Sequence, residues 1–296
     1  MLLSLILLVN SCYPTTTIAI QEPENELYIT SYNCQNNKII TKSLTQTIKD
    51  ANALNKISFN SSTEGNISSI TNEDEINPRT VFNKDEWIKV SPRDPRIAYI
   101  RTYWKDGGSN TRGTAFFISN DTVVTSAHCI YNASRGGWCD YADIFPAKNE
   151  SDQPYGQISS DIIHLLTSYI ESPSVNNDYA IIELERAKNH NGYFGWNTSA
   201  TTGQYIKIMG YPSCLVNNPA STTAPIIKQY YDTGTIGSVY TGYIKTTNTN
   251  TNGGSSGGPV LNSNNQAIAI VKGHNSSSNS ATRVDSYAAQ WFSTFR

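Results

Sequence analysis

The sequence has few charged residues and no strong excess of either sign. Only 16% of its 296 residues are Asp, Glu, Lys or Arg, and 22 basic residues stand against 24 acidic ones. Proteins that bind nucleic acid or an anionic membrane through charge usually carry a basic excess. The composition therefore gives no reason to expect a nucleic-acid partner or a membrane-surface partner.

Metal-binding patterns are also scarce. The chain has 4 histidines, and it contains neither a Cys-x-x-Cys pair nor a His-Glu-x-x-His motif. Zinc sites are usually recognised by these spacings. We therefore expect no metal and no other cofactor.

The 5 cysteines are too few for a disulfide-rich scaffold. In an oxidising compartment, Cys129 and Cys139 would be able to close a short loop. Cys12 would leave with an N-terminal signal. Cys214 would then be unpaired in the mature chain, or paired with Cys34 before processing.

Long hydrophobic runs are absent, apart from one at the N-terminus. Residues 1–9 read MLLSLILLV, without a basic segment before them. This run is too short for a bilayer span, which takes about 20 residues. We interpret residues 1–19 as a secretory signal peptide, with a buried strand and a lipoprotein box ending at Cys12 as alternatives. A secreted, extracellular protein is expected, with no membrane contact beyond this signal.

Residues 20–80 are polar and lack a hydrophobic pattern, most clearly between residues 55 and 77. Such a segment buries too little apolar surface to order itself strongly. We interpret it as a propeptide or a flexible N-terminal extension, with a processing point at Arg79-Thr80. The alternative is an extension that stays attached.

From residue 97 onward the sequence is typical of an all-β protein. Turn residues such as Asn120-Asp121, Gly203 and Thr233-Gly234 separate short runs rich in β-branched and aromatic side chains. Many short strands without helical repeats favour a sandwich or barrels. Residues 287–295 place apolar side chains at helical spacing, which predicts a C-terminal helix. The predicted strands are Ile97–Trp104, Thr114–Ser119, Thr122–Ala127, Tyr179–Glu185, Tyr205–Tyr211, Ile226–Tyr231, Tyr243–Thr247 and Ala267–Lys272.

Ser256 lies within the run Gly253-Gly254-Ser255-Ser256-Gly257-Gly258-Pro259. A serine hydroxyl is a weak nucleophile, and it needs a base to take its proton and donors to hold the oxyanion. Glycines let the backbone turn sharply and point its N–H groups inward. If Ser256 attacks a carbonyl, the N–H groups of Ser256 and Gly254 are the natural oxyanion donors. The alternative is a flexible Gly/Ser loop.

A candidate base and a candidate acid precede this serine. His128 comes shortly after the β-branched run Thr122–Val124, at a strand end where a side chain can face a cleft. Asp178 directly precedes the apolar strand Tyr179–Ile182. A satisfied core histidine and a turn-capping aspartate are the alternatives. The rival acids, none of which introduces such a strand, are Asp140, Asp143 and Asp161.

The order His, Asp, Ser along the chain resembles the chymotrypsin-like serine proteases. Further segments resemble the glutamyl endopeptidase branch of that family, and the resemblance covers residues 81–296. These segments are Gly136-Gly137-Trp138, Phe145–Asn149, Pro154-Tyr155-Gly156, Gly192–Trp196, Gly210-Tyr211-Pro212 and Ser276–Val284.

The resemblance implies two six-stranded antiparallel β-barrels, a closing C-terminal helix, and a catalytic triad in the cleft between the barrels. It implies that Ser256 is the nucleophile, that His128 is the general base and then the general acid, and that Asp178 orients the imidazole. It further implies a mature N-terminus between Thr80 and Phe82. Ser255 stands where trypsin-like enzymes carry the aspartate that pairs with their freed N-terminus, so activation must differ.

The substrate pocket resembles the glutamyl branch only in part. Relatives that cut after Lys or Arg carry an acid where this chain has Asn250, whereas the glutamyl branch has a threonine that Thr251 matches. The branch also has a histidine in the strand after the nucleophile, where this chain has Val271, and His274 follows nearby. Thr251 and His274 are therefore the candidate substrate-binding residues, and a weakened preference for Glu is expected.

The sequence thus predicts a secreted, monomeric serine endopeptidase that acts on proteins or peptides. A non-catalytic protease homologue that binds a partner through the same cleft is the alternative. A carboxylester hydrolase is disfavoured, because that class usually places its serine before its acid and histidine.

Overall fold

The computed structural model describes residues 26–54, 87–105, 110–186, 192–213, 227–274 and 279–295. The expected signal peptide, the expected cut near residue 80, Cys214 and the side chain of His274 lie outside this description. Within these ranges, no helix is both long enough and apolar enough to cross a membrane.

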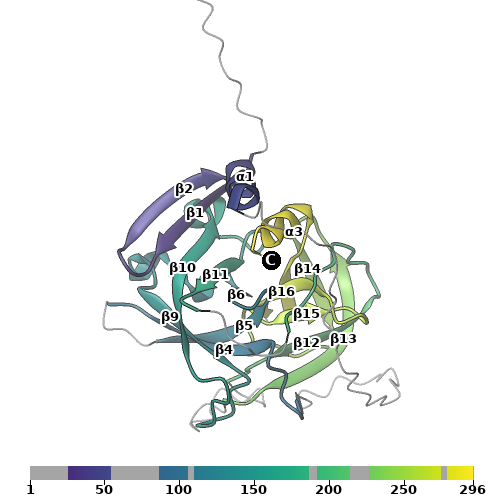
Figure 1. Ribbon diagram of the computed structural model, residues 1–296. Helices are drawn as coiled ribbons and strands as arrows, with labels where there is room; N and C mark the ends of the chain where they lie inside the picture. Colours follow the sequence, from purple (N-terminus) through teal and green to yellow (C-terminus); the bar gives the residue numbers. More distant parts are fainter. Residues whose placement is uncertain are drawn as a thin grey trace, which may run out of the picture.

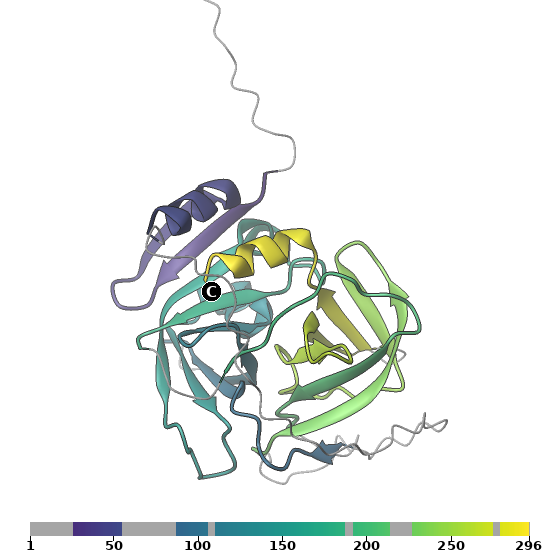
Figure 2. The ribbon, with the colours of Figure 1, turned by 45° about the vertical axis from the view of Figure 1, so that its right-hand side comes forward.

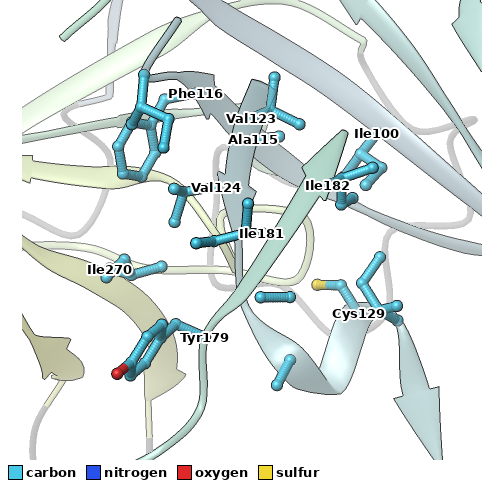
Figure 3. Packing of buried hydrophobic residues seen from close by; sticks show 14 of the residues in the cluster. Ile100, Ala115, Phe116, Val123, Val124, Cys129, Tyr179, Ile181, Ile182 and Ile270 are labelled. Carbon is cyan, nitrogen blue, oxygen red and sulfur yellow. The ribbon is translucent and has the colours of Figure 1, made fainter. Parts of the chain in front are cut away.

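The first half of the chain forms a closed antiparallel barrel of six strands (Figure 1). The order is β11-β6-β5-β4-β9-β10, and pairing of β10 with β11 closes it. Side chains of β5, β6 and β11 fill the interior, and Ile270 from the second half packs beside them (Figure 3). The strands are β4 (Ile97–Tyr103), β5 (Thr111–Phe117), β6 (Thr122–Thr125), β9 (Tyr141–Pro146), β10 (Ile158–Leu166) and β11 (Ala180–Leu184).

The second half forms another closed antiparallel barrel, in the order β12-β15-β16-β17-β14-β13, with β12 paired to β13. The short strand β3 (Ile88–Lys89) adds to β13. The prediction of two six-stranded antiparallel barrels is confirmed. The strands are β12 (Tyr205–Gly210), β13 (Tyr230–Val239), β14 (Tyr243–Thr247), β15 (Pro259–Leu261), β16 (Ala267–His274) and β17 (Asn279–Arg283).

Short helices sit outside the barrels. The predicted C-terminal helix is present as α3 (Ser286–Ser293), where Asp285 caps the first turn by accepting from the N–H of Ala288 at 2.9 Å. Trp291 and Phe292 are fully buried on its inner face. The other elements are α2 (Thr167–Glu171), the 3-10 turns η1 (Ala127–Cys129) and η2 (Ala133–Arg135), and the small hairpin of β7 (Tyr131–Asn132) and β8 (Gly137–Trp138).

An N-terminal hairpin extends the first barrel, contrary to the expectation for residues 20–80. It consists of β1 (Tyr28–Asn33), β2 (Lys38–Ser43) and α1 (Leu44–Leu54), and β1 pairs with β10 (Figure 2). Ile29 is 1% exposed, and the Tyr32 ring stacks on Trp138 with centroids 5.5 Å apart. The description as a flexible, unpatterned segment is therefore wrong for residues 26–54. The propeptide interpretation stays a prediction.

One predicted strand was misplaced. Ile226–Tyr231 was expected, but β13 starts at Tyr230 and continues through Thr233-Gly234, which had been interpreted as a turn. Gly234 is a glycine for a different reason, since a Cβ there would clash with Thr247 and Thr249. Close approach of two strands, rather than a turn, requires it.

The expected loop between Cys129 and Cys139 is not closed by a disulfide. Cys34, Cys129 and Cys139 are free thiols. The Cys129 side chain lies in the core of the first barrel, where its sulfur packs against Gly113 (Figure 3). Since Cys129 and Cys139 are both buried, each behaves as a small apolar side chain in the packed interior.

Candidate active site

His128 and Asp178 come together at the open end of the first barrel. His128 lies in the turn η1 that follows β6, and Asp178 lies directly before β11, the strand that pairs with β6. The carboxylate accepts from the backbone N–H of His128 at 2.9 Å, and its other oxygen lies 2.8 Å from Nδ1 of the same residue. Asp178 is 1% exposed, and it is therefore no turn cap at the surface.

These contacts set the protonation of the imidazole. Burial by itself lowers the pKa of His128, whereas a negative charge on Cys129 or on Asp178, and the hydrogen bond to Asp178, raise it. The net direction is upward, and Asp178 contributes to it both through its charge and through its hydrogen bond. Because Nδ1–H donates to Asp178, the other ring nitrogen, Nε2, is the one left to exchange a proton.

The rival acids are occupied elsewhere. Asp143 accepts from Gln157 at 2.7 Å and from Ser159 at 3.1 Å, and Asp140 pairs with Lys105 at 2.9 Å. Asp161 lies within β10. Of the predicted acids, only Asp178 hydrogen-bonds to His128.

Ser256 lies on a tight loop that is hydrogen-bonded to the first barrel. Thr114 on β5 donates its N–H to the Ser256 carbonyl at 2.8 Å and its hydroxyl to the Gly254 carbonyl at 2.7 Å. Gly254 and Gly257 have φ values of 92° and 85°, and a Cβ at either would clash with neighbouring backbone. Glycine is therefore required at both positions.

The same loop leaves two N–H groups without an acceptor. The carbonyl oxygens of Gly253 and Ser255 are both hydrogen-bonded. Ser213 donates its N–H to the Gly253 oxygen at 2.6 Å, and Gly258 donates its N–H to the Ser255 oxygen at 3.0 Å. The N–H groups of Gly254 and Ser256 belong to these two peptide planes, so they point the opposite way. In the described part of the chain neither donates to a protein acceptor, which suits a pair of oxyanion donors.

The Ser256 hydroxyl donates to the Lys272 carbonyl at 3.0 Å. No hydrogen bond joins it to His128 among the described residues. Lys272 and His128 line the same cavity, of about 460 Å³, so Ser256 is hydrogen-bonded to one of the residues that line it. A rotation of the hydroxyl away from Lys272 is needed before it can donate to the imidazole.

The candidate pocket residues are only partly brought together. Thr251 is 4% exposed, and its hydroxyl donates to Asn279 at 2.8 Å. The backbone of His274 pairs with that of Asn279, and its side chain lies outside the description. Val271 is fully buried in the core cluster of the second barrel, so the missing pocket histidine is replaced by a packing residue.

Two contributors to the site were missed in the sequence. Thr114 holds the nucleophile loop, and the Lys272 carbonyl accepts from Ser256. Thr114 stands in a predicted strand, and only the meeting of the two barrels gives it this role. The sequence carries no local signal for either contact.

Comparisons with known proteins agree with this geometry. The family model described as "Trypsin-like peptidase domain" matches residues 113–270. The chain is 30% identical over 218 residues to "Extracellular metalloprotease" of Bacillus subtilis (strain 168), covering 71% of this chain and 67% of that protein. It is 38% identical over 102 residues to "Glutamyl endopeptidase" of Bacillus licheniformis, but this match spans only 33% of the chain and 32% of that protein. In the described part of the chain, no group of three or more His, Cys, Asp or Glu side chains is placed to hold a metal ion.

Solved structures share the fold. A Glu endopeptidase in complex with MPD has a TM-score of 0.61 at 23% identity, covering 72% of this chain and 98% of that one. The protease Anisep from Arthrobacter nicotinovorans has a TM-score of 0.57 at 20% identity, covering 70% and 98%. A scabies mite inactivated protease paralogue has a TM-score of 0.55 at 17% identity, covering 71% and 97%. The fold therefore accommodates both active and inactivated proteins.

Proposed function

Since the chain belongs to the trypsin-like peptidases, we propose that it cleaves peptide bonds with Ser256 as nucleophile, His128 as base and acid, and Asp178 as orienting carboxylate. The observation that carries this proposal is the double hydrogen bond between His128 and Asp178 in a cavity that is also lined by Lys272, the hydrogen-bond partner of Ser256. The unoccupied N–H groups of Gly254 and Ser256 support it.

The reaction runs in two halves. The Ser256 oxygen attacks the substrate carbonyl carbon while its proton passes to Nε2 of His128, and the carbonyl oxygen becomes an oxyanion facing the N–H groups of Gly254 and Ser256. When the carbon–nitrogen bond breaks, Nε2–H protonates the leaving amine and an acyl-enzyme remains. Water then repeats the sequence and releases the acid. Asp178 stabilises the imidazolium that exists in each half.

A fluorophosphonate probe tests this assignment, because it labels only an activated serine. We expect one labelled residue, Ser256, with labelling and peptide hydrolysis both lost in Ser256→Ala. A chain that folds but takes no probe would instead be a binding homologue. Labelling of another serine would show that the nucleophile is misassigned.

For the substrate we propose a preference for Glu at the residue before the cut. The match of Thr251, the absence of an acid at Asn250 and the glutamyl endopeptidases among the relatives support it. One charge-assisted hydrogen bond contributes about 1.5–3 kcal/mol, so the loss of the branch's histidine should weaken the preference for Glu over Gln by about ten- to a hundredfold while keeping its direction. The measurement is kcat/KM on matched peptides with Glu, Gln, Asp, Lys or Phe there. A higher value for Lys or Phe would contradict the preference but not the triad.

We also propose secretion and processing. The apolar residues 1–9 and the name of the Bacillus subtilis relative support export. N-terminal sequencing of the active protein from culture medium should give a start between Thr80 and Phe82. Full activity of a chain that still begins near residue 20 would contradict the propeptide interpretation.

A further inference from the structure

The cavity beside His128 has two chemically different walls. The first barrel supplies Tyr169 from α2 and Pro173 and Val175 from the loop that follows. The second barrel supplies two lysines, Lys245 on β14 and Lys272 on β16. Tyr243 on β14 also lines the second wall, so both walls contribute an aromatic side chain, and only the second carries the positive charge.

Neither lysine charge is neutralised by a carboxylate in the part of the chain that the structure describes, although the Lys245 ammonium lies over the Tyr240 ring, 5.9 Å from its centroid. Neither takes part in an ion pair there, whereas Lys42, Lys105 and Lys228 do. Among the described residues, Asp178 is the only acid that lines the cavity, and it is buried and already bonded twice to His128. The open part of the cavity is thus cationic, in a protein whose formal net charge is −2.

The two walls are fixed to each other, so the cavity is built into the fold. The Thr282 hydroxyl, on β17, contacts the carbonyls of Val175 at 2.8 Å and Asp178 at 3.3 Å. Gly242 packs so closely on Asn176 that a Cβ there would clash. Because β17 also pairs with β14, the strand that carries Lys245 is tied to the same loop.

We propose that this cavity is a substrate subsite that selects an acidic side chain, held by the ammonium groups of Lys245 and Lys272. The inference rests on the proposed peptidase function and extends it to a second substrate position. That position is distinct from the residue before the cut, because neither Thr251 nor Asn250 lines the cavity. The preferred substrate therefore carries an acidic residue elsewhere in the segment that crosses the cleft, and its flanking apolar atoms pack on Tyr169.

The test is a charge scan of the substrate. Peptides keep the best residue before the cut and carry Glu, Gln or Lys, one at a time, at each of the neighbouring positions on both sides. We expect kcat/KM to favour Glu over Lys at one position by about two- to fivefold for each lysine, which is the range for exposed ion pairs. This preference should shrink in high salt, since exposed charges are screened.

Variants connect the preference to the two side chains. Lys245→Gln and Lys272→Gln should each reduce the Glu/Lys ratio at that position, and Lys245→Glu should bring it close to one, because Lys272 then offsets the new carboxylate. Because the Glu/Lys ratio of kcat/KM is measured within each variant, a change that slows all peptides equally does not alter it. Lys89→Gln removes the same charge from β3, which does not line the cavity, and should leave the ratio unchanged.

The outcomes separate the subsite from the proposed function. Hydrolysis of an uncharged peptide, lost in Ser256→Ala, reports the peptidase activity alone. If that activity is present but no position distinguishes Glu from Lys, the subsite is wrong. A Glu/Lys ratio that stays unchanged when both lysines are replaced would also contradict the subsite.

Discussion

The two barrels differ in how far their residues are already positioned for the proposed reaction. The first barrel presents His128 and Asp178 as one preassembled unit, joined by two hydrogen bonds beside the paired strands β6 and β11. The second presents Ser256 on a glycine loop, with its hydroxyl turned to Lys272 rather than to the base. The acid–base pair is thus a property of one barrel, whereas its alignment with the nucleophile depends on how the barrels meet.

Breaking the preassembled pair should have the largest effect. His128→Ala should lower kcat by about 10⁵- to 10⁶-fold, because the members of a triad act as a unit. For the same reason, the double variant His128→Ala/Asp178→Ala should be hardly worse than the single one. Steady-state kinetics of both variants provide the measurement. Additive losses would mean that the two residues act independently.

Asp178→Asn should cost somewhat less, about 10⁴-fold in kcat, by favouring the wrong imidazole tautomer. It should also move the pH profile. Asp178 raises the pKa of His128, and only the neutral imidazole accepts a proton, so activity falls as pH drops through that pKa. Removing the charge lowers the pKa, and the acidic limb of kcat/KM should shift to lower pH. A shift to higher pH would contradict the assignment.

Loosening the contact between the barrels should have an intermediate effect. Thr114→Val removes the hydroxyl that donates to Gly254 and accepts from the Tyr211 N–H at 2.9 Å. A buried group left unsatisfied costs about 1–3 kcal/mol. We expect a loss of about tenfold or more, mainly in kcat, since the loop carries the nucleophile.

Thr114→Ser keeps the hydroxyl and should retain most of the activity. The acidic limb of the pH profile should stay in place in both Thr114 variants, because His128 and Asp178 are untouched. A displaced limb would mean that Thr114 acts through the acid–base pair instead.

The smallest effect on activity is expected in the N-terminal hairpin, which lengthens only the first barrel. Ile29→Ala should lower the free energy of unfolding by about 2–5 kcal/mol, as expected for a buried isoleucine. Ile39→Ala, at a side chain that is 54% exposed, is the matched control and should change little. Denaturant unfolding in a Ser256→Ala background measures both without self-cleavage. A separate early transition of the hairpin would show that it is not part of the same folding unit.

The residue pattern alone predicted an all-β protein, either a sandwich or barrels, with a C-terminal helix, and the resemblance to the chymotrypsin-like proteases added the two-barrel architecture. Short β-branched runs with turn residues between them depend on local chemistry, and the order of His128, Asp178 and Ser256 is visible along the chain. The glycines around Ser256 are visible in the sequence and suit the positive φ values of Gly254 and Gly257, but the clashes that a Cβ would cause there involve Tyr211 and Thr114 from distant segments.

Only the tertiary structure decided the features that join distant segments. β1 buries Ile29 and Tyr32, and it orders because β10, far along the chain, completes its backbone hydrogen bonds. In the sequence, Gly234 resembles a turn residue, and only the close approach of β14 in the folded structure explains why it is a glycine. Two further features arise where the two barrels meet: the hydrogen bond from Thr114 to Gly254, and the cavity lined by Lys245 and Lys272. Local propensity carries no information about such contacts, because their free energy appears only when the partner segment is in place.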